Sequence, residues 1–355
     1  MVINKKELVT LLINLICVKM LFTYPRYLTI ICGNSAWINC IYVSLLSFLL
    51  FLATFKLYEK TGKKGILELA YEIGKRPFQI IVGLIIICSF ILNTAMNTRI
   101  YPESVKNVLL TLTPMSLIVF MLAIAVAICT FCGFQALMRT HAICVPIVII
   151  IFSFLSVLLL PYININNIFP IMGTGVKAIF AEGLFSLSIF SDMFMIYLLL
   201  PFCENYRDCK KGGIIAIISA SAISITITLL YNLVYPAPAS ADFIFPIYQI
   251  TRLIKIGDFF ARLDAFFEFF WSFIMMIYYA FYLFMISFVF SKITDIKNIK
   301  PVIIPMLIII LSISYLPQSS VTLLDYSKKI YTVTTPILII LPILIPIIYK
   351  IKFRK

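Results

Sequence analysis

The chain has 355 residues, of which 62% are hydrophobic and only 12% are charged, and its formal net charge is +14. A soluble globular domain contains roughly 45–50% apolar residues. The composition therefore excludes a soluble protein and also a nucleic-acid partner as the reason for the positive charge. Because the lysines and arginines lie between apolar runs, we expect them to orient membrane spans and to contact anionic lipid headgroups.

Apolar segments along the chain predict about ten membrane-spanning helices, since a bilayer core needs about 20 apolar residues per helix. In chain order they cover approximately residues 8–32, 36–55, 78–98, 116–137, 142–160, 179–200, 213–235, 265–290, 301–317 and 333–349. No polar linker rich in proline and glycine separates two cores. We therefore predict one all-α membrane domain over residues 1–355.

The basic residues of the loops predict the orientation, because short cytoplasmic loops carry an excess of lysine and arginine. If the N-terminus is inside, the outer segments hold only Arg99, Lys106, Lys177, Arg252, Lys255, Arg262, Lys328 and Lys329. A miscounted span would invert every later loop and blur this bias. We therefore expect an integral membrane protein whose N- and C-termini are both cytoplasmic.

Ten spans divide into two halves of five that enter the membrane from opposite sides, which permits an inverted repeat. We predict half-repeats of approximately residues 1–165 and 166–355. In this architecture the first helix of each half is broken at mid-membrane, and the exposed backbone binds substrate. The corresponding spans here are the first and the sixth.

The first span contains Lys19 and Met20, followed by Thr23-Tyr24-Pro25. Proline removes a helix hydrogen bond, so we expect a kink or an unwound turn just before Pro25. A half-helix that starts there would direct free N–H groups toward a carboxylate. The alternatives are a simple proline kink and a Lys19 side chain that extends to the interface.

The sixth span offers Gly183, Ser186, Ser188 and Asp192 as candidate ligand-binding residues. Gly183 weakens a helix, and the serine hydroxyls can satisfy freed backbone groups. An acid inside a span is costly and indicates a functional site, and a carboxylate such as Asp192 is the natural partner of Lys19. The alternative is a carboxylate that caps a helix end in a wet cavity.

Other polar groups point less directly to function. Asn93 in the third span is a further candidate ligand contact, although asparagine in hydrocarbon usually bridges helices. His141 lies near Cys129, Cys132 and Cys144, which we interpret as buried thiols rather than as zinc ligands. The chain has no P-loop, G-x-S-x-G or H-E-x-x-H motif. We therefore predict no enzymatic activity, no cofactor and no metal.

Several short motifs resemble the spore germination permeases, which are the B subunits of nutrient germinant receptors within the amino acid-polyamine-organocation superfamily. In chain order the motifs are Met20-Leu21-Phe22-Thr23-Tyr24-Pro25-Arg26, Gly33-Asn34-Ser35-Ala36-Trp37-Ile38, Asn167-Ile168-Phe169-Pro170-Ile171, Pro201, Phe245-Pro246, Arg262-Leu263-Asp264 and Trp271. Their order and spacing extend along nearly the whole chain.

The resemblance implies a leucine-transporter-like fold in the spore inner membrane that senses an amino acid or similar nutrient with A and C partner subunits. One departure is that Val18, Lys19 and Met20 stand where the family usually carries glycines. Two alternatives stay open. One is an autonomous amino acid transporter coupled to protons or sodium, and the other is a membrane scaffold that binds no ligand.

Overall fold

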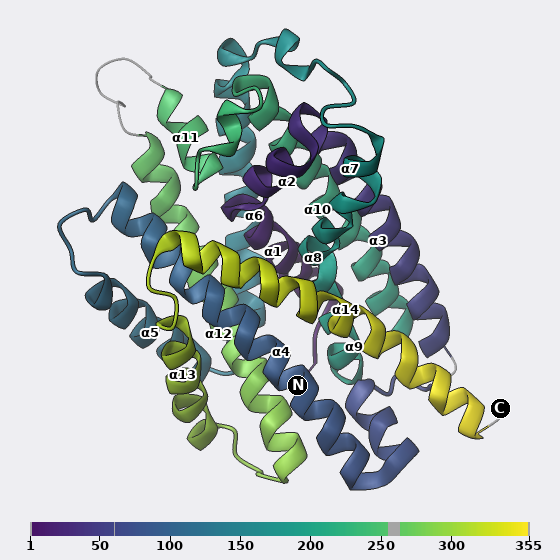
Figure 1. Cartoon of the computed structure of the whole chain (residues 1–355). Helices are drawn as coiled ribbons and strands as arrows, with labels where there is room; N and C mark the ends of the chain where they lie inside the picture. Colours follow the sequence, from purple (N-terminus) through teal and green to yellow (C-terminus); the bar gives the residue numbers. More distant parts are fainter. Residues whose placement is uncertain (1, 60, 255–262, 354–355) are drawn as a thin grey trace.

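A computed structural model describes residues 2–59, 61–254 and 263–353 of the chain as helices joined by turns and loops (Figure 1). The helices are α1 (Lys5–Phe22), α2 (Tyr24–Cys32), α3 (Ala36–Tyr58), α4 (Ile66–Val108), α5 (Met115–Phe131), α6 (Phe134–Leu158), α7 (Val176–Phe180), α8 (Leu187–Phe190), α9 (Ile196–Leu199), α10 (Tyr206–Val234), α11 (Pro246–Leu253), α12 (Leu263–Thr294), α13 (Lys300–Ser314) and α14 (Ser320–Phe353). Lys255 and Arg262, two of the predicted outer basic residues, lie outside the described residues.

Seven helical segments within these described ranges are long and apolar enough to cross a membrane. They are Tyr24–Tyr58, Ile66–Asn107, Phe134–Leu158, Val176–Phe202, Tyr206–Val234, Leu263–Thr294 and Ser320–Phe353. Helices α5 and α13 are apolar but shorter, and α1 has 18 residues with Lys19 in its last turn. These elements coincide with the predicted segments, so the all-α membrane fold is confirmed.

Two predicted spans lie inside longer helical elements, and only one of these elements is continuous. Helix α4 begins at Ile66 but is kinked at Gly74 and Lys75, whose backbone angles are not helical, so its long apolar part starts close to the predicted residue 78. Helix α14 begins at Ser320 and passes through Lys328-Lys329, which had placed the predicted boundary at residue 333. Charged side chains end an apolar pattern without ending a helix, so the predicted boundary at residue 333 was wrong.

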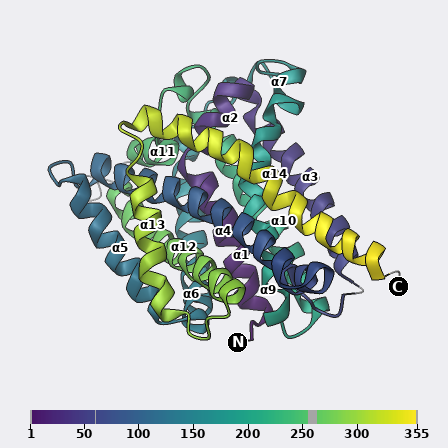
Figure 2. The ribbon, with the colours of Figure 1, turned by 60° about the horizontal axis from the view of Figure 1, so that its bottom comes forward.

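The helices pack in a reciprocal pattern around a central layer. Helix α1 and the segment Val176–Phe202, called here the interrupted segment, lie inside the bundle, and α4 and α14 cross in front of them (Figures 1 and 2). Helix α4 packs against α14 and α13, while α12 packs against α6 and α5. The two sets of contacts match, with α4 in one half corresponding to α12 in the other. A two-fold relation between two five-helix halves requires such a match.

Both chain ends lie on one face of the bundle. The Ile3 amide donates to the Phe202 carbonyl at 2.8 Å, and Lys63 donates to the carbonyl of Glu204. The neighbouring Lys64 ammonium lies 5.8 Å from the ring centre of Tyr349, near the end of α14. These contacts join the N-terminus to the C-terminal turn of α14, on the side where both ends are drawn in Figure 1.

On the opposite face, the end of α2 is tied to the loop that precedes the interrupted segment. Thr174 Oγ1 donates to the Ile31 carbonyl at 2.6 Å. Gly173 has a φ of 46°, and a Cβ atom there would lie 2.0 Å from the carbonyl oxygen of Cys32. A glycine is therefore required for this close approach. The contact fixes the two chain segments that carry the candidate site relative to one another.

We predict that Gly173→Ala destabilises the protein by about 2–4 kcal/mol, from the positive φ and from overlap with backbone. The matched control is Gly62→Ala, because Gly62 has a φ of 64° but nothing within 4 Å of an added Cβ. Unfolding of the two variants in the same detergent measures the difference. Equal losses of stability would show that the contact with Cys32 contributes nothing.

Candidate functional site

The first span is interrupted at Thr23, one residue before the half-helix that carries Pro25. Helix α1 ends at Phe22, Thr23 has φ −117° and ψ −8°, and α2 begins at Tyr24 with proline in its first turn. The proline ring removes the N–H that would have continued the ladder. The predicted kink before Pro25 is confirmed, and it is confined to a single residue.

The interrupted segment consists of helical turns too short to form one continuous helix. Helices α7, α8 and α9 alternate with 3-10 turns at Glu182–Ser186, Ser191–Met195 and Leu200–Phe202. A change between i→i+4 and i→i+3 bonding frees backbone carbonyls from the regular ladder. The carbonyl of Ser188 accepts from the Ser191 hydroxyl at 2.9 Å.

A buried ion pair joins the two interrupted spans. Lys19 Nζ lies 2.6 Å from Asp192 Oδ1, and both side chains are 0% exposed. The same ammonium donates to the Ser188 carbonyl at 3.1 Å and to the Ser191 hydroxyl at 3.2 Å. An ammonium group has three protons to donate. Each has an oxygen acceptor here, so the charge is fully coordinated by the interrupted segment.

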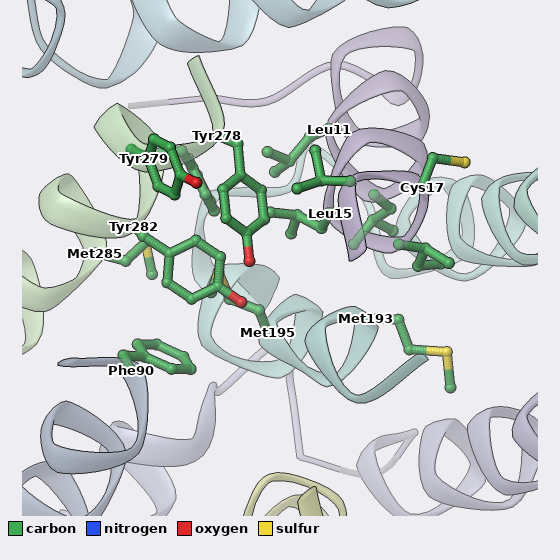
Figure 3. Close-up of a cluster of buried hydrophobic side chains, with 14 of the residues drawn as sticks. Leu11, Leu15, Cys17, Phe90, Met193, Met195, Tyr278, Tyr279, Tyr282 and Met285 are labelled. Carbon is green, nitrogen blue, oxygen red and sulfur yellow. The ribbon is translucent and has the colours of Figure 1, made fainter. Parts of the chain in front are cut away.

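Aromatic side chains enclose the ion pair. The ammonium lies 5.3 Å from the ring centre of Tyr331, and Tyr278 donates to Asp192 Oδ2 at 3.3 Å. The hydroxyls of Tyr278 and Tyr282 point toward the interrupted segment in Figure 3. Tyr24, in the first turn of α2, bonds through its hydroxyl to the Ser188 hydroxyl. The rings shield the two charges from solvent and so strengthen their attraction.

The structure brings four of the predicted site residues into direct contact. Lys19, Tyr24, Ser188 and Asp192 form one connected set of polar contacts. The expected pairing of Lys19 with Asp192 is present, and the lysine does not extend to the interface. Whether this set binds a ligand stays a prediction.

The remaining predicted residues of the first span serve the helix interruption. The backbone carbonyl of Thr23 accepts from the Tyr27 amide at 3.1 Å, and the backbone carbonyl of Pro25 accepts from the Thr29 hydroxyl at 2.8 Å. Met20 is completely buried and belongs to the hydrophobic core. These three residues therefore define the shape of α1 and α2 beside the ion pair.

Gly183, Ser186 and Asn93 have different surroundings. A Cβ atom on Gly183 would lie 2.0 Å from Asn39 Nδ2, so this glycine admits the side chain of α3. The Ser186 hydroxyl is buried, and within the described part of the chain it has no hydrogen-bond partner. Asn93 accepts from Thr334 at 2.8 Å, which bridges α4 to α14 as the packing interpretation expected.

Sequence reasoning missed Tyr331, whose ring faces the ammonium. Tyr331 donates to Asn97 Oδ1 at 2.8 Å, which holds the ring in place. The tenth span was expected to begin at residue 333, so Tyr331 was assigned to a loop. Tyr331 precedes Thr334 by three residues. Extending the predicted helix by one turn toward its N-terminus would therefore have placed the two side chains on the same face.

Comparisons with known proteins agree with this architecture. A family model described as spore germination protein matches residues 2–322. Spore germination protein B2 of Bacillus subtilis (strain 168) is 24% identical over 252 residues, which cover 70% of this chain and 68% of that protein.

Among solved structures, the chain is similar to MHP1, a nucleobase-cation-symport-1 family transporter, in a closed conformation with bromovinylhydantoin bound. The TM-score is 0.59 at 11% identity, over 95% of this chain and 77% of that one. This likeness shows the fold. The leucine-transporter-like arrangement, with interrupted first and sixth spans, is therefore confirmed.

We predict that Lys19→Met lowers the free energy of unfolding by about 3–5 kcal/mol, because it leaves Asp192 as an unpaired buried charge. The double variant Lys19→Met/Asp192→Asn should lose less than the single variant, since both charges are then absent. Denaturation in one detergent compares them, with the exposed Lys297→Met as control. Losses that simply add would show that the two side chains are not coupled.

Proposed function

Because the chain belongs to the spore germination protein family, we propose that it is the B subunit of a nutrient germinant receptor and binds a small nutrient at mid-membrane. The name of the Bacillus subtilis relative supports the role in germination. The buried Lys19–Asp192 pair, placed where two spans are interrupted, is the observation that supports ligand binding at this position.

The chemistry of the pair favours a zwitterion, and an amino acid is the simplest one. Lys19 can donate to an α-carboxylate, while Asp192 and the Ser188 carbonyl can accept from an α-ammonium group. Binding of a zwitterion would replace the Lys19–Asp192 pair by two pairs, one between Lys19 and the ligand carboxylate and one between Asp192 and the ligand ammonium. The net charge of the site therefore stays at zero. A ligand with a single charge would instead leave one buried ion without a counter-ion, at a cost of several kcal/mol.

Binding must open the site, because Tyr24 and Tyr331 enclose the ion pair and both rings are buried. The interruption at Thr23 provides a place where α2 can move relative to α1 with little loss of hydrogen bonding. A nutrient that pairs with the separated charges favours the opened state over the closed one. Its differential affinity for the two states is the source of the signal.

The signal reaches partner subunits in this proposal. The family resemblance implies A and C subunits, and the shared face of the two termini is where loops rich in lysine gather. We assign that face to the cytoplasm because of its basic residues. The location that the family implies is the spore inner membrane, and contact with the partners would convert helix movement into germination.

A second candidate function is autonomous amino acid transport, which the likeness to the transporter fold supports. Lys19 is coordinated by oxygens as a bound cation would be, so transport would need no sodium at this position. A third possibility, a scaffold that binds no nutrient, follows from Val18 and Met20, which are completely buried where the family usually has glycine. Thermal shift against an amino acid panel with no response throughout would favour the scaffold.

We predict that Lys19→Met and Asp192→Asn raise the nutrient concentration for half-maximal germination by about 10–100-fold, as expected for the loss of one charge-assisted hydrogen bond. Spores that carry each variant are tested against an amino acid panel, with immunoblots to confirm that the subunit is present. Lys297→Met, an exposed lysine, is the control. Unchanged sensitivity to every nutrient in both variants would remove this pair from the binding site.

Uptake by the protein alone distinguishes the receptor from the transporter. We expect the purified chain in liposomes to show no accumulation of a radiolabelled amino acid above empty liposomes, with or without a proton gradient. Accumulation that the Lys19→Met variant abolishes would support the transporter and contradict the receptor.

A further inference from the structure

Two cysteine thiols meet where the interrupted segment ends and α10 begins. The thiol of Cys203 donates to the sulfur of Cys209 at 2.9 Å, and both side chains are buried. Non-bonded carbon atoms pack at separations of about 3.5–4.0 Å, and sulfur is larger than carbon. The two sulfurs are therefore closer than ordinary packing brings them, while both cysteines are free thiols.

The two thiols come from different elements that a short link joins. Cys203 follows the 3-10 turn Leu200–Phe202, and its extended backbone, with φ −73° and ψ 141°, ends the interrupted segment. Asn205 is also extended and precedes α10, in which Cys209 is the fourth residue. The amide of Cys209 donates to the Asn205 carbonyl at 3.0 Å. The start of α10 thus turns the sulfur of Cys209 back toward Cys203.

Neighbouring segments hold the backbone on both sides of Cys203. The amide of Ile3 donates to the Phe202 carbonyl at 2.8 Å, and the Lys63 ammonium donates to the Glu204 carbonyl. The sulfur of Cys203 therefore has little freedom to leave Cys209. A disulfide has an S–S bond of about 2.05 Å, so bond formation requires the sulfurs to approach by less than about 1 Å.

A metal ion is not the group that these thiols would hold. A structural zinc site takes four ligands, usually from cysteine and histidine. Within the described residues, no group of three or more histidine, cysteine, aspartate or glutamate side chains is placed to hold a metal. Two thiols in contact, without further ligands, are instead the arrangement that oxidation converts into a disulfide.

We propose that Cys203 and Cys209 are a redox modification site, which a hydroperoxide oxidises to an intramolecular disulfide. Cys203 reacts first, because it is 7% exposed and is followed by the exposed Glu204 and Asn205, whereas Cys209 is 1% exposed. The Cys203 thiolate attacks the peroxide, and the O–O bond breaks. A sulfenic acid forms on Cys203, and an alcohol leaves, or water if the oxidant is hydrogen peroxide.

The second step closes the disulfide. The sulfur of Cys209 attacks the sulfenic sulfur of Cys203, so that the S–S bond forms and the S–O bond breaks. The hydroxide that leaves takes the proton of the Cys209 thiol and departs as water. Over both steps the peroxide gains two electrons, and each sulfur gives up one.

The disulfide ties the end of the interrupted segment to α10. Asp192 lies earlier in the same segment, so the bond restricts movement of the part of the chain that carries the ion pair relative to α10. Reduction by a small dithiol removes the restriction. This inference does not rest on the proposed nutrient site, because the two thiols are in contact in the protein without a ligand.

The test treats the purified full chain in lipid nanodiscs with hydrogen peroxide, alkylates the remaining thiols and analyses the peptides by mass spectrometry. We expect the peptides that carry Cys203 and Cys209 to be joined with the loss of two hydrogens, and dithiothreitol to separate them. Hydrogen exchange of the amides of residues 196–202 should slow by roughly three- to tenfold in the oxidised protein, since the bond restrains local opening.

Cys203→Ser and Cys209→Ser should each abolish the link and the slower exchange. Cys88→Ser, which removes an exposed thiol, is the matched control and should keep both. The proposal is overturned if wild-type Cys203 and Cys209 stay reduced while the exposed Cys88 and Cys132 oxidise, or if Cys203 proceeds to a sulfinic acid without joining Cys209. Both of these results come from the wild type, so they decide the question even if a variant does not fold.

Discussion

A lysine and an aspartate cannot be placed in the middle of a membrane bundle independently of one another. Either charge alone would cost several kcal/mol, and their mutual attraction offsets this only when geometry and additional hydrogen bonds are good. Lys19 meets that condition because Asp192, the Ser191 hydroxyl and the Ser188 carbonyl all accept from its ammonium. All three acceptors lie in the interrupted segment, so the same contacts neutralise the charge and hold that segment against α1.

The rest of the bundle keeps the two interrupted spans side by side. Helices α4 and α12 each pack against partners from the other half of the chain, so the core is surrounded by continuous helices. The contact of Gly173 with Cys32 on one face and of Ile3 with Phe202 on the other joins the first span to the interrupted segment at both ends. Short helical turns that would be unstable alone are stable in this frame, because tertiary packing supplies what local hydrogen bonding lacks.

Helix α1 presents two polar side chains, five residues apart, on different faces. One face presents Lys19 to the ion pair, and the other presents Asn14 to an apolar cleft. The first polar group is fully coordinated by the chain itself, while the second has no partner among the residues described.

Composition and local pattern determined the membrane class, the order of the spans and the place of both interruptions, since these follow from apolar length, Pro25 and the run of small polar residues around Ser188. The pairing of Lys19 with Asp192 was also foreseen, because an intramembrane charge requires a counter-ion. Only the tertiary structure decided that Tyr331 faces the ammonium, that Gly183 serves packing against Asn39, and that Asn14 has no hydrogen-bond partner within the described part of the chain. These properties depend on which helices touch, and contacts between residues far apart in sequence leave no periodic signal in one chain.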